Sequence, residues 1–249
     1  MALGDLLVVL VALLALVGYL GAVAAAHPVR AWPRLRSAAW VGGVLAVLGG
    51  TVGPLATAAH TDFTAHAVTH LLVGMLGPLL LVCGAPATVA LRALPVPQAR
   101  RLSRLLAGRP LSWLSEPVVA AVLSVGGLAL LYLTPLYGWA QRDPVLHLLV
   151  HAHLLVAGYL LTASLVGADP MPHRRSFPHR AVVLVAAAAG HAILTKHLYA
   201  YPPDGVTTGA AQAGALVMYY GGDVVELALA ALLCSRWFAR PRWRTVAPA

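Results

Sequence analysis

Histidines are concentrated in two short stretches of this 249-residue chain, and their spacing is typical of metal sites on helices. The stretch HTDFTAHAVTH contains His66 and His70, and the stretch HLLVHAH contains His147 and His151, four residues apart in each case. Residues four apart lie on the same face of a helix. Each pair is therefore expected to chelate one metal ion, and two such helices facing each other would supply four nitrogens.

Imidazole in its neutral form binds copper, zinc, iron and nickel. His153 lies off the face shared by His147 and His151 and is expected either to meet a different partner or to mark the interface. Two other interpretations stay open. The histidines could hydrogen-bond between helices with tyrosines, threonines and carbonyls, or one histidine from each pair could ligate a haem.

Acidic residues form a second pattern, in the last apolar run. Gln212, Tyr219, Asp223 and Glu226 follow one stripe of a helix. Asp223 lies about 16 Å from Gln212 at the usual helical rise, and an acid at that depth is expected to face the interior of a helix bundle. It would act as a proton carrier, as charge balance for a metal, as a partner of Lys196, or as a protonated acid that joins helices.

The composition places all of these residues in a membrane. The chain is 60% hydrophobic and 10% charged, with a mean hydropathy of +0.81, whereas about a quarter of the residues of an ordinary soluble domain are charged. The net charge is +9, but the arginines form short clusters between apolar runs and no continuous basic face. Such clusters are typical of the loops that set the orientation of a membrane protein, and nucleic-acid binding is not expected.

Seven apolar runs have about the length of a membrane span, near 20 residues. They are approximately Leu6–Ala26, Ala38–Ala59, Phe63–Cys83, Val118–Leu136, Val145–Val166, Ala181–Tyr199 and Gln212–Phe238. Backbone amides must be satisfied internally in lipid, so these runs should be helices. The predicted fold class is all-α, a polytopic membrane bundle of seven transmembrane helices.

The charges between the runs predict the orientation. Arg30, Arg34 and Arg36 follow the first run, and the later loops alternate between basic and near-neutral. The positive-inside rule then places the N-terminus outside and the C-terminus in the cytoplasm. We expect one integral membrane domain over residues 1–249. Within it, residues 84–116 form a basic cytoplasmic loop, which is either an amphipathic surface segment or an ordinary solvated loop.

This topology gathers eight of the eleven histidines near the outer face. They are His60, His66, His70, His147, His151, His153, His191 and His197.

Three segments resemble a known family. Ala65–Pro86 (AHAVTHLLVGMLGPLLLVCGAP) resembles the signature of the seven-span CtaG family of cytochrome c oxidase assembly factors. His147–Pro170 (HLLVHAHLLVAGYLLTASLVGADP) is similar to the second histidine-rich span of that family, and Ala211–Leu232 resembles its last span.

The resemblance implies a bacterial plasma-membrane protein with several spans that helps to mature haem–copper oxidases, with oxidase subunits as partners and copper delivery as its task. The ligand candidates that it implies are His66, His70, His147, His151 and His153. The chain has no arrangement of nucleophile, base and acid, so catalysis is not expected. Whether the chain forms a homo-oligomer stays an open question.

The leading hypothesis is a copper site in the outer leaflet formed by His66, His70, His147 and His151, with His60 and His191 as further ligands. Copper would pass to an oxidase subunit by ligand exchange. The alternatives are a copper or proton transporter that uses Asp223 and Glu226, a haem-binding membrane electron carrier, and a purely structural assembly scaffold.

Overall fold

The computed structural model describes residues 3–26, 31–171 and 173–239, and every regular element within these ranges is a helix. This confirms the predicted all-α class. Six helical stretches among the described residues are long and apolar enough to cross a membrane: Gly4–Ala26, Arg34–Ala58, Phe63–Ala93, Pro144–Val166, Phe177–Ala200 and Thr208–Phe238. The chain is therefore a multi-pass membrane protein.

The remaining apolar helix, Pro117–Leu133, is shorter than the other six. It corresponds to the fourth predicted run, Val118–Leu136, which ends early because the helix stops at Thr134 before Pro135. The seven-span prediction is thus confirmed for six helices. The seventh span and the orientation of the termini stay predictions.

Several of the spans consist of successive helical elements. The first half of the chain contains α1 (Leu3–Ala26), α2 (Arg34–Thr51), α3 (Pro54–Ala58), α4 (Phe63–His70), the π-helix η1 (Leu71–Leu76), α5 (Gly77–Cys83), α6 (Pro86–Ala93), α7 (Val96–Leu106) and α8 (Arg109–Leu114). The second half contains α9 (Pro117–Ala121), the π-helix η2 (Val122–Gly126), α10 (Gly127–Leu133), α11 (Leu136–Ala140), α12 (Pro144–Val166), α13 (Phe177–Ala200) and α14 (Thr208–Phe238).

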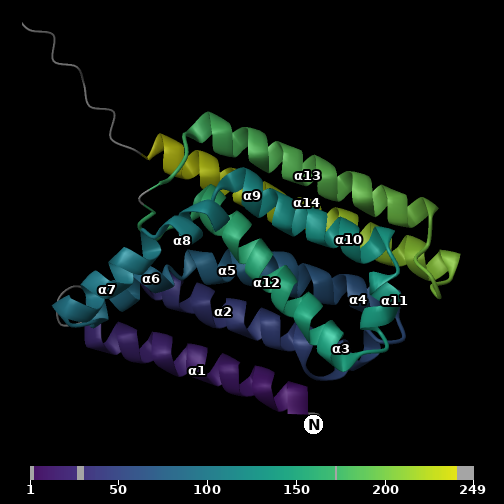
Figure 1. Ribbon diagram of the computed structural model, residues 1–249, viewed down its shortest axis with the longest axis horizontal. Helices are drawn as coiled ribbons and strands as arrows, with labels where there is room; N and C mark the ends of the chain where they lie inside the picture. Colours follow the sequence, from purple (N-terminus) through teal and green to yellow (C-terminus); the bar gives the residue numbers. More distant parts are fainter. Residues whose placement is uncertain (1–2, 27–30, 172, 240–249) are drawn as a thin grey trace, which may run out of the picture.

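The long helices form a bundle with two distinct ends (Figure 1). Helices α13 and α14 pack side by side along one edge, and α1 and α2 lie at the opposite edge with α12 between them. Helices α6, α7 and α8, from the basic loop 84–116, gather at the end where α1 finishes. The short α3 and α11 lie at the other end, where α4 and α12 begin. The histidine-rich segments therefore start at the same end of the bundle.

Two of the segments that resemble the family meet at the end of the bundle where α6, α7 and α8 lie, which we call the basic end. Ala85 adopts a left-handed conformation, with φ of 50°, and Pro86 opens α6. The Asp169 carboxylate accepts hydrogen bonds from the Ala87 amide (3.2 Å), the Thr88 amide (2.7 Å) and the Thr88 hydroxyl (2.6 Å). The Gly-Ala-Pro and Gly-Ala-Asp-Pro segments are thus joined, because a carboxylate from one caps the helix that the other begins.

Close helix packing brings the two histidine-bearing spans together. Gly158 of α12 lies directly against the Gly74 carbonyl of η1, and a Cβ at position 158 would overlap that oxygen. Small residues permit such backbone approach in membrane bundles. This contact holds the span that carries His66 and His70 against the span that carries His151.

Candidate functional site

Three histidines form a stack of rings at the end of the bundle that is predicted to face outside. The His147 ring centroid lies 4.8 Å from that of His60 and 4.3 Å from that of His151. The carboxylate of Asp143 accepts hydrogen bonds from two amides of the first turn of α12, so this helix begins at Pro144 and places His147 and His151 on its first turns. We call His60, His147 and His151 the outer histidine stack.

The outer histidine stack borders a cavity of about 400 Å³, whose lining also includes Asp5, Gln141 and Arg142. His60 is exposed and His151 is buried, so the stack leads from the surface into the bundle. The His151 Nδ1 lies 3.0 Å from the His147 carbonyl oxygen, to which it donates. The other nitrogen, Nε2, therefore keeps its lone pair free to accept a proton or a metal ion.

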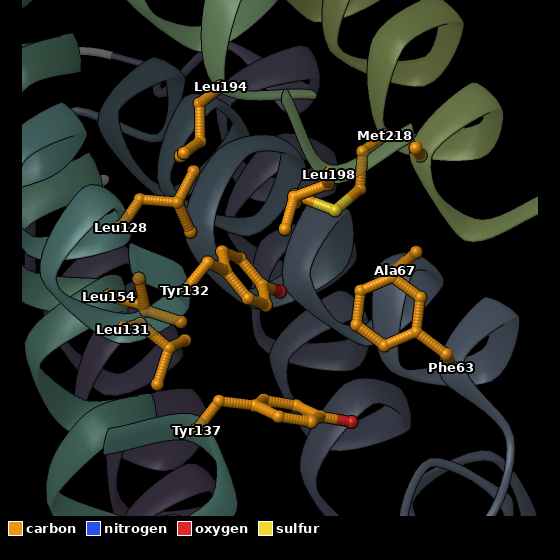
Figure 2. Packing of buried hydrophobic residues seen from close by; sticks show 11 residues of the cluster. Phe63, Ala67, Leu128, Leu131, Tyr132, Tyr137, Leu154, Leu194, Leu198 and Met218 are labelled. Atoms are coloured by element: carbon orange, nitrogen blue, oxygen red, sulfur yellow. The ribbon is translucent and has the colours of Figure 1, made fainter. Parts of the chain in front are cut away.

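His66 is held in an aromatic cage. Its Nε2 lies 2.9 Å from the Tyr132 hydroxyl, and its ring packs edge to face against Tyr137 and stacks on Phe63, at centroid distances of 5.0 and 5.8 Å. Figure 2 shows these three aromatic side chains around one region of the core. Burial raises the pKa of the Tyr137 phenol, which keeps this residue neutral.

Sequence reasoning missed Tyr132 and Tyr137 as neighbours of a histidine. The signal that could have indicated them is that a tyrosine in an apolar run needs a partner for its hydroxyl.

A second pair of histidines lies deeper in the bundle. The rings of His70 and His191 have centroids 6.0 Å apart, and both residues are about 5% exposed. The His191 Nδ1 lies 3.3 Å from Oε1 of Glu226. We call His70 and His191 the deep histidine pair.

The structure thus distributes the predicted ligands between different surroundings. His147 and His151 are in contact as predicted, whereas His66 faces the aromatic cage and His70 faces α13. Successive turns of one helix face meet different neighbours here, because Tyr132 and Tyr137 pack against His66, whereas His191 of α13 packs against His70. Within the described residues, no three His, Cys, Asp or Glu side chains stand together in an arrangement that could hold a metal ion.

Two further candidates are placed away from both groups. The exposed His153 donates through Nε2 to the Leu123 carbonyl of η2, 3.0 Å away. The Nζ of Lys196 lies 5.4 Å from the ring centroid of Tyr219. The ion pairs among the described residues do not include one between Lys196 and Asp223.

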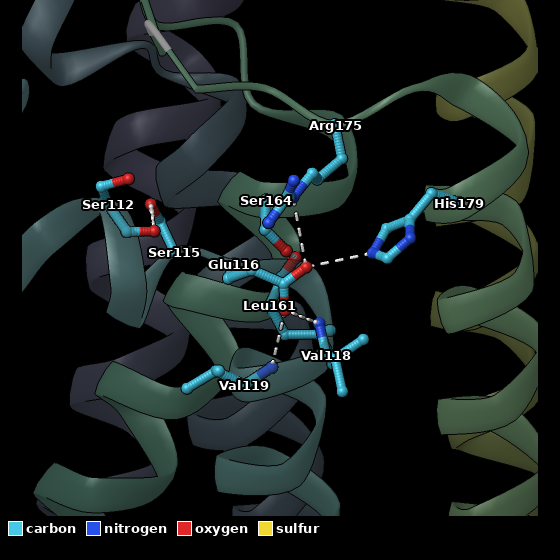
Figure 3. Close-up of polar contacts among 9 residues, drawn as sticks. All are labelled: Ser112, Ser115, Glu116, Val118, Val119, Leu161, Ser164, Arg175 and His179. Carbon is cyan, nitrogen blue, oxygen red and sulfur yellow. Dashed lines mark hydrogen bonds and ion pairs between the residues drawn. The ribbon is translucent and has the colours of Figure 1, made fainter.

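A separate polar cluster joins α9 to α13 at the basic end (Figure 3). One oxygen of the Glu116 carboxylate accepts from the Val118 and Val119 amides, and the other lies 3.0 Å from His179 Nε2 and 3.4 Å from Arg175 Nε. Burial alone would raise the pKa of Glu116, but the hydrogen bonds from the two amides and from His179 hold it below its usual value.

Comparison with known proteins identifies the family of the chain. Residues 17–240 match the family model described as cytochrome c oxidase caa3 assembly factor (Caa3_CtaG). Uncharacterized proteins of Mycobacterium bovis and Mycobacterium tuberculosis are each 34% identical to the chain over 174 residues, and one of Mycobacterium leprae is 32% identical. These alignments cover 65% of this chain.

The chain spans about a quarter of the length of these curated relatives, since 25% or 26% of each is covered. Their bacterial source is consistent with a plasma-membrane location. No solved structure matches the chain. The family match extends from the middle of α1 to the end of α14 and includes every histidine of both groups, so the chain belongs to the cytochrome c oxidase caa3 assembly factor family, Caa3_CtaG.

Proposed function

We propose that this chain assists the assembly of a haem–copper cytochrome c oxidase by binding copper at the outer histidine stack and delivering it to an oxidase subunit. The observation that supports the proposal most directly is the stack itself, in which two histidines of α12 and one from the turn before α4 border a cavity of about 400 Å³. Imidazole nitrogens suit copper, and the His147 carbonyl already orients the His151 ring so that Nε2 is free.

The open position of the stack suits a cargo ion. His60 is exposed, His147 is half-buried and His151 is buried, so a metal ion would be held between one accessible and one enclosed ligand. The rings now stack, and ligating one ion requires them to rotate so that their nitrogens converge. Ligand exchange would begin at His60, because an incoming ligand from a partner subunit reaches this side chain first.

Metal content of the purified chain tests the proposal. The chain would be isolated in detergent from copper-supplemented cells, and copper per chain would be measured beside a visible spectrum. The test variant carries His147→Ala and His151→Ala together. His153→Ala is the matched control, because His153 lies on the same helix but bonds to the Leu123 carbonyl.

The parent and the control are expected to retain copper that the double variant loses. Failure of every sample to bind copper, including after anaerobic reconstitution, would contradict the proposal. A Soret band in the parent would favour the haem-binding electron carrier instead. Copper flux into vesicles that is abolished by Asp223→Asn would favour the transporter.

A further inference from the structure

The deep histidine pair borders a small cavity inside the bundle. The cavity has a volume of about 50 Å³ and is lined by residues of α4, η1, η2, α10, α12, α13 and α14. Besides His70 and His191, its lining includes the Glu226 carboxylate, the Ser124 hydroxyl and the Met75 thioether. One ordered water needs roughly 10–15 Å³ of such space, so the cavity has room for one ion or a few waters.

The two histidines in this cavity have ring nitrogens that bond to nothing in the described part of the chain. Both nitrogens of His70 and Nε2 of His191 are buried without a hydrogen-bond partner among the described residues. Buried polar atoms in native proteins almost always have a hydrogen-bond partner, and a buried polar atom without one destabilises the fold. These three nitrogens therefore point to an occupant of the cavity.

The surrounding groups favour a soft cation with a single charge. Glu226 faces Nδ1 of His191 at 3.3 Å, so this nitrogen carries the proton and Nε2 presents its lone pair, as in metal sites where a carboxylate orients the ligating histidine. One carboxylate balances one positive charge, whereas a divalent ion would leave a buried excess charge. Imidazole and thioether ligands together favour Cu(I).

The backbone around the cavity is shaped to admit the two rings. A Cβ at position 222 would overlap Cε1 of His191, and one at position 74 would lie 3.3 Å from Cε1 of His70. Both π-helical segments of the described residues, η1 and η2, contribute to the lining, through Met75 and Ser124 among others. Such segments occur frequently at functional sites.

We infer that the cavity is a second copper site, separate from the outer histidine stack, in which His70 and His191 bind Cu(I), Met75 lies beside the ion, and Glu226 neutralises its charge. The identity of the metal rests on the proposed function. The existence of the site rests on the cavity and its unpartnered nitrogens.

Anaerobic titration of the purified full-length chain with Cu(I) tests the inference, with bound copper counted per chain. The deep variant is His70→Ala with His191→Ala, and the outer variant is His147→Ala with His151→Ala. Each variant is expected to lose one equivalent of copper relative to the parent and to retain the other. Added Zn²⁺ is expected not to displace the copper ion bound in the deep site, because the second positive charge of zinc would have no carboxylate to balance it.

A second pair of variants guards against loss of folding. Gly222→Ala displaces the His191 ring without removing it, whereas a Cβ at the adjacent Gly221 meets the flexible end of the Leu71 side chain. Gly222→Ala is expected to lose the deep equivalent and Gly221→Ala to keep it.

The possible outcomes separate the two sites. Parental copper content in both the deep variant and Gly222→Ala would overturn the inference and indicate that waters fill the cavity. Copper that is lost in the deep variant but kept in the outer variant at the parental level would support the deep site while contradicting the proposed function of the stack.

Discussion

The outer histidine stack and the deep histidine pair use the same side chain in opposite surroundings. The stacked rings touch one another at centroid distances of 4.8 and 4.3 Å and border a cavity of about 400 Å³. The deep rings lie 6.0 Å apart, border a cavity of about 50 Å³ and face a carboxylate. An ion in the stack would meet incoming ligands, whereas an ion in the deep cavity would be enclosed. Burial therefore separates a group suited to exchange from a group suited to retention.

Both groups depend on one helix contact. His70 precedes η1 and His151 lies on α12, and these two elements meet where Gly158 packs on the Gly74 carbonyl. A change at this contact should affect both groups together, and it therefore gives the largest expected effect.

Gly158→Ala is expected to destabilise the protein by about 3 kcal/mol, at the upper end of the usual cost of overpacking, because the new methyl group overlaps backbone rather than a flexible side chain. Thermal unfolding in detergent measures the change. Gly21→Ala in α1 is the control, since no heavy atom lies within 4 Å of its added Cβ, and a helical Gly→Ala change there should stabilise by roughly 0.5–1 kcal/mol. Equal stability of the two variants would show that the contact at Gly158 does not hold the spans together.

The lengths of the apolar runs were sufficient to predict the helical class and six of the spans, and the four-residue spacing was sufficient to predict the contact between His147 and His151. The same spacing rule did not separate His66 from His70. Spacing gives the helix face, but the partner on that face depends on which helix packs there, and here the aromatic cage contacts the first ring and α13 the second. Glu226 was placed on the same helical stripe as Asp223, the acid predicted to face the interior. Its contact with His191 could not be predicted, because that contact depends on the packing of α13 on α14.

Replacement of Glu226 distinguishes the two groups energetically. Glu226→Leu leaves Nδ1 of His191 buried without its carboxylate and is expected to cost about 2 kcal/mol, within the usual range for an unsatisfied buried group. Glu226→Gln retains an oxygen for the ring and should cost less. Chemical denaturation in detergent gives both values. Equal stability of the parent and the Leu variant would mean that the carboxylate does not hold the ring, and the contrast with the open stack would then lose its electrostatic basis.

Tyr132→Phe tests whether His66 belongs to the core or to a copper site. The change removes the hydroxyl that lies 2.9 Å from Nε2 of His66 while it keeps the aromatic packing. A loss of about 1 kcal/mol is expected, as for one hydrogen bond, with the copper content of the outer histidine stack unchanged. A fall in bound copper without a loss of stability would instead join His66 to the stack as a ligand.

The smallest expected effect is on the pH dependence of stability. It comes from Glu116, which lies away from both histidine groups. Because the folded protein holds the pKa of this carboxyl below its usual value of 4.5, Glu116 contributes stability above that value, and the contribution is lost as the pH falls through the lower, folded pKa. Glu116→Gln should therefore flatten the stability profile below about pH 4.5 and leave it unchanged near neutrality. Unfolding midpoints of the parent and the variant, measured across this range, would give the difference.

The Glu116→Gln variant also bears on the release of copper in acid, because acid releases metal from histidine ligands by protonating them. Glu116 bridges α9 and α13, and α13 carries His191. Loosening of that bridge in acid would disturb the deep histidine pair before it disturbed the stack, which lies on other elements. If copper release from the deep site follows the same pH profile in the parent and in Glu116→Gln, protonation of the histidines themselves causes the release. If the pH profile of copper release shifts in Glu116→Gln only for the deep site, the contact of Glu116 with α13 controls release from that site. The two groups then differ in what releases their ions as well as in burial.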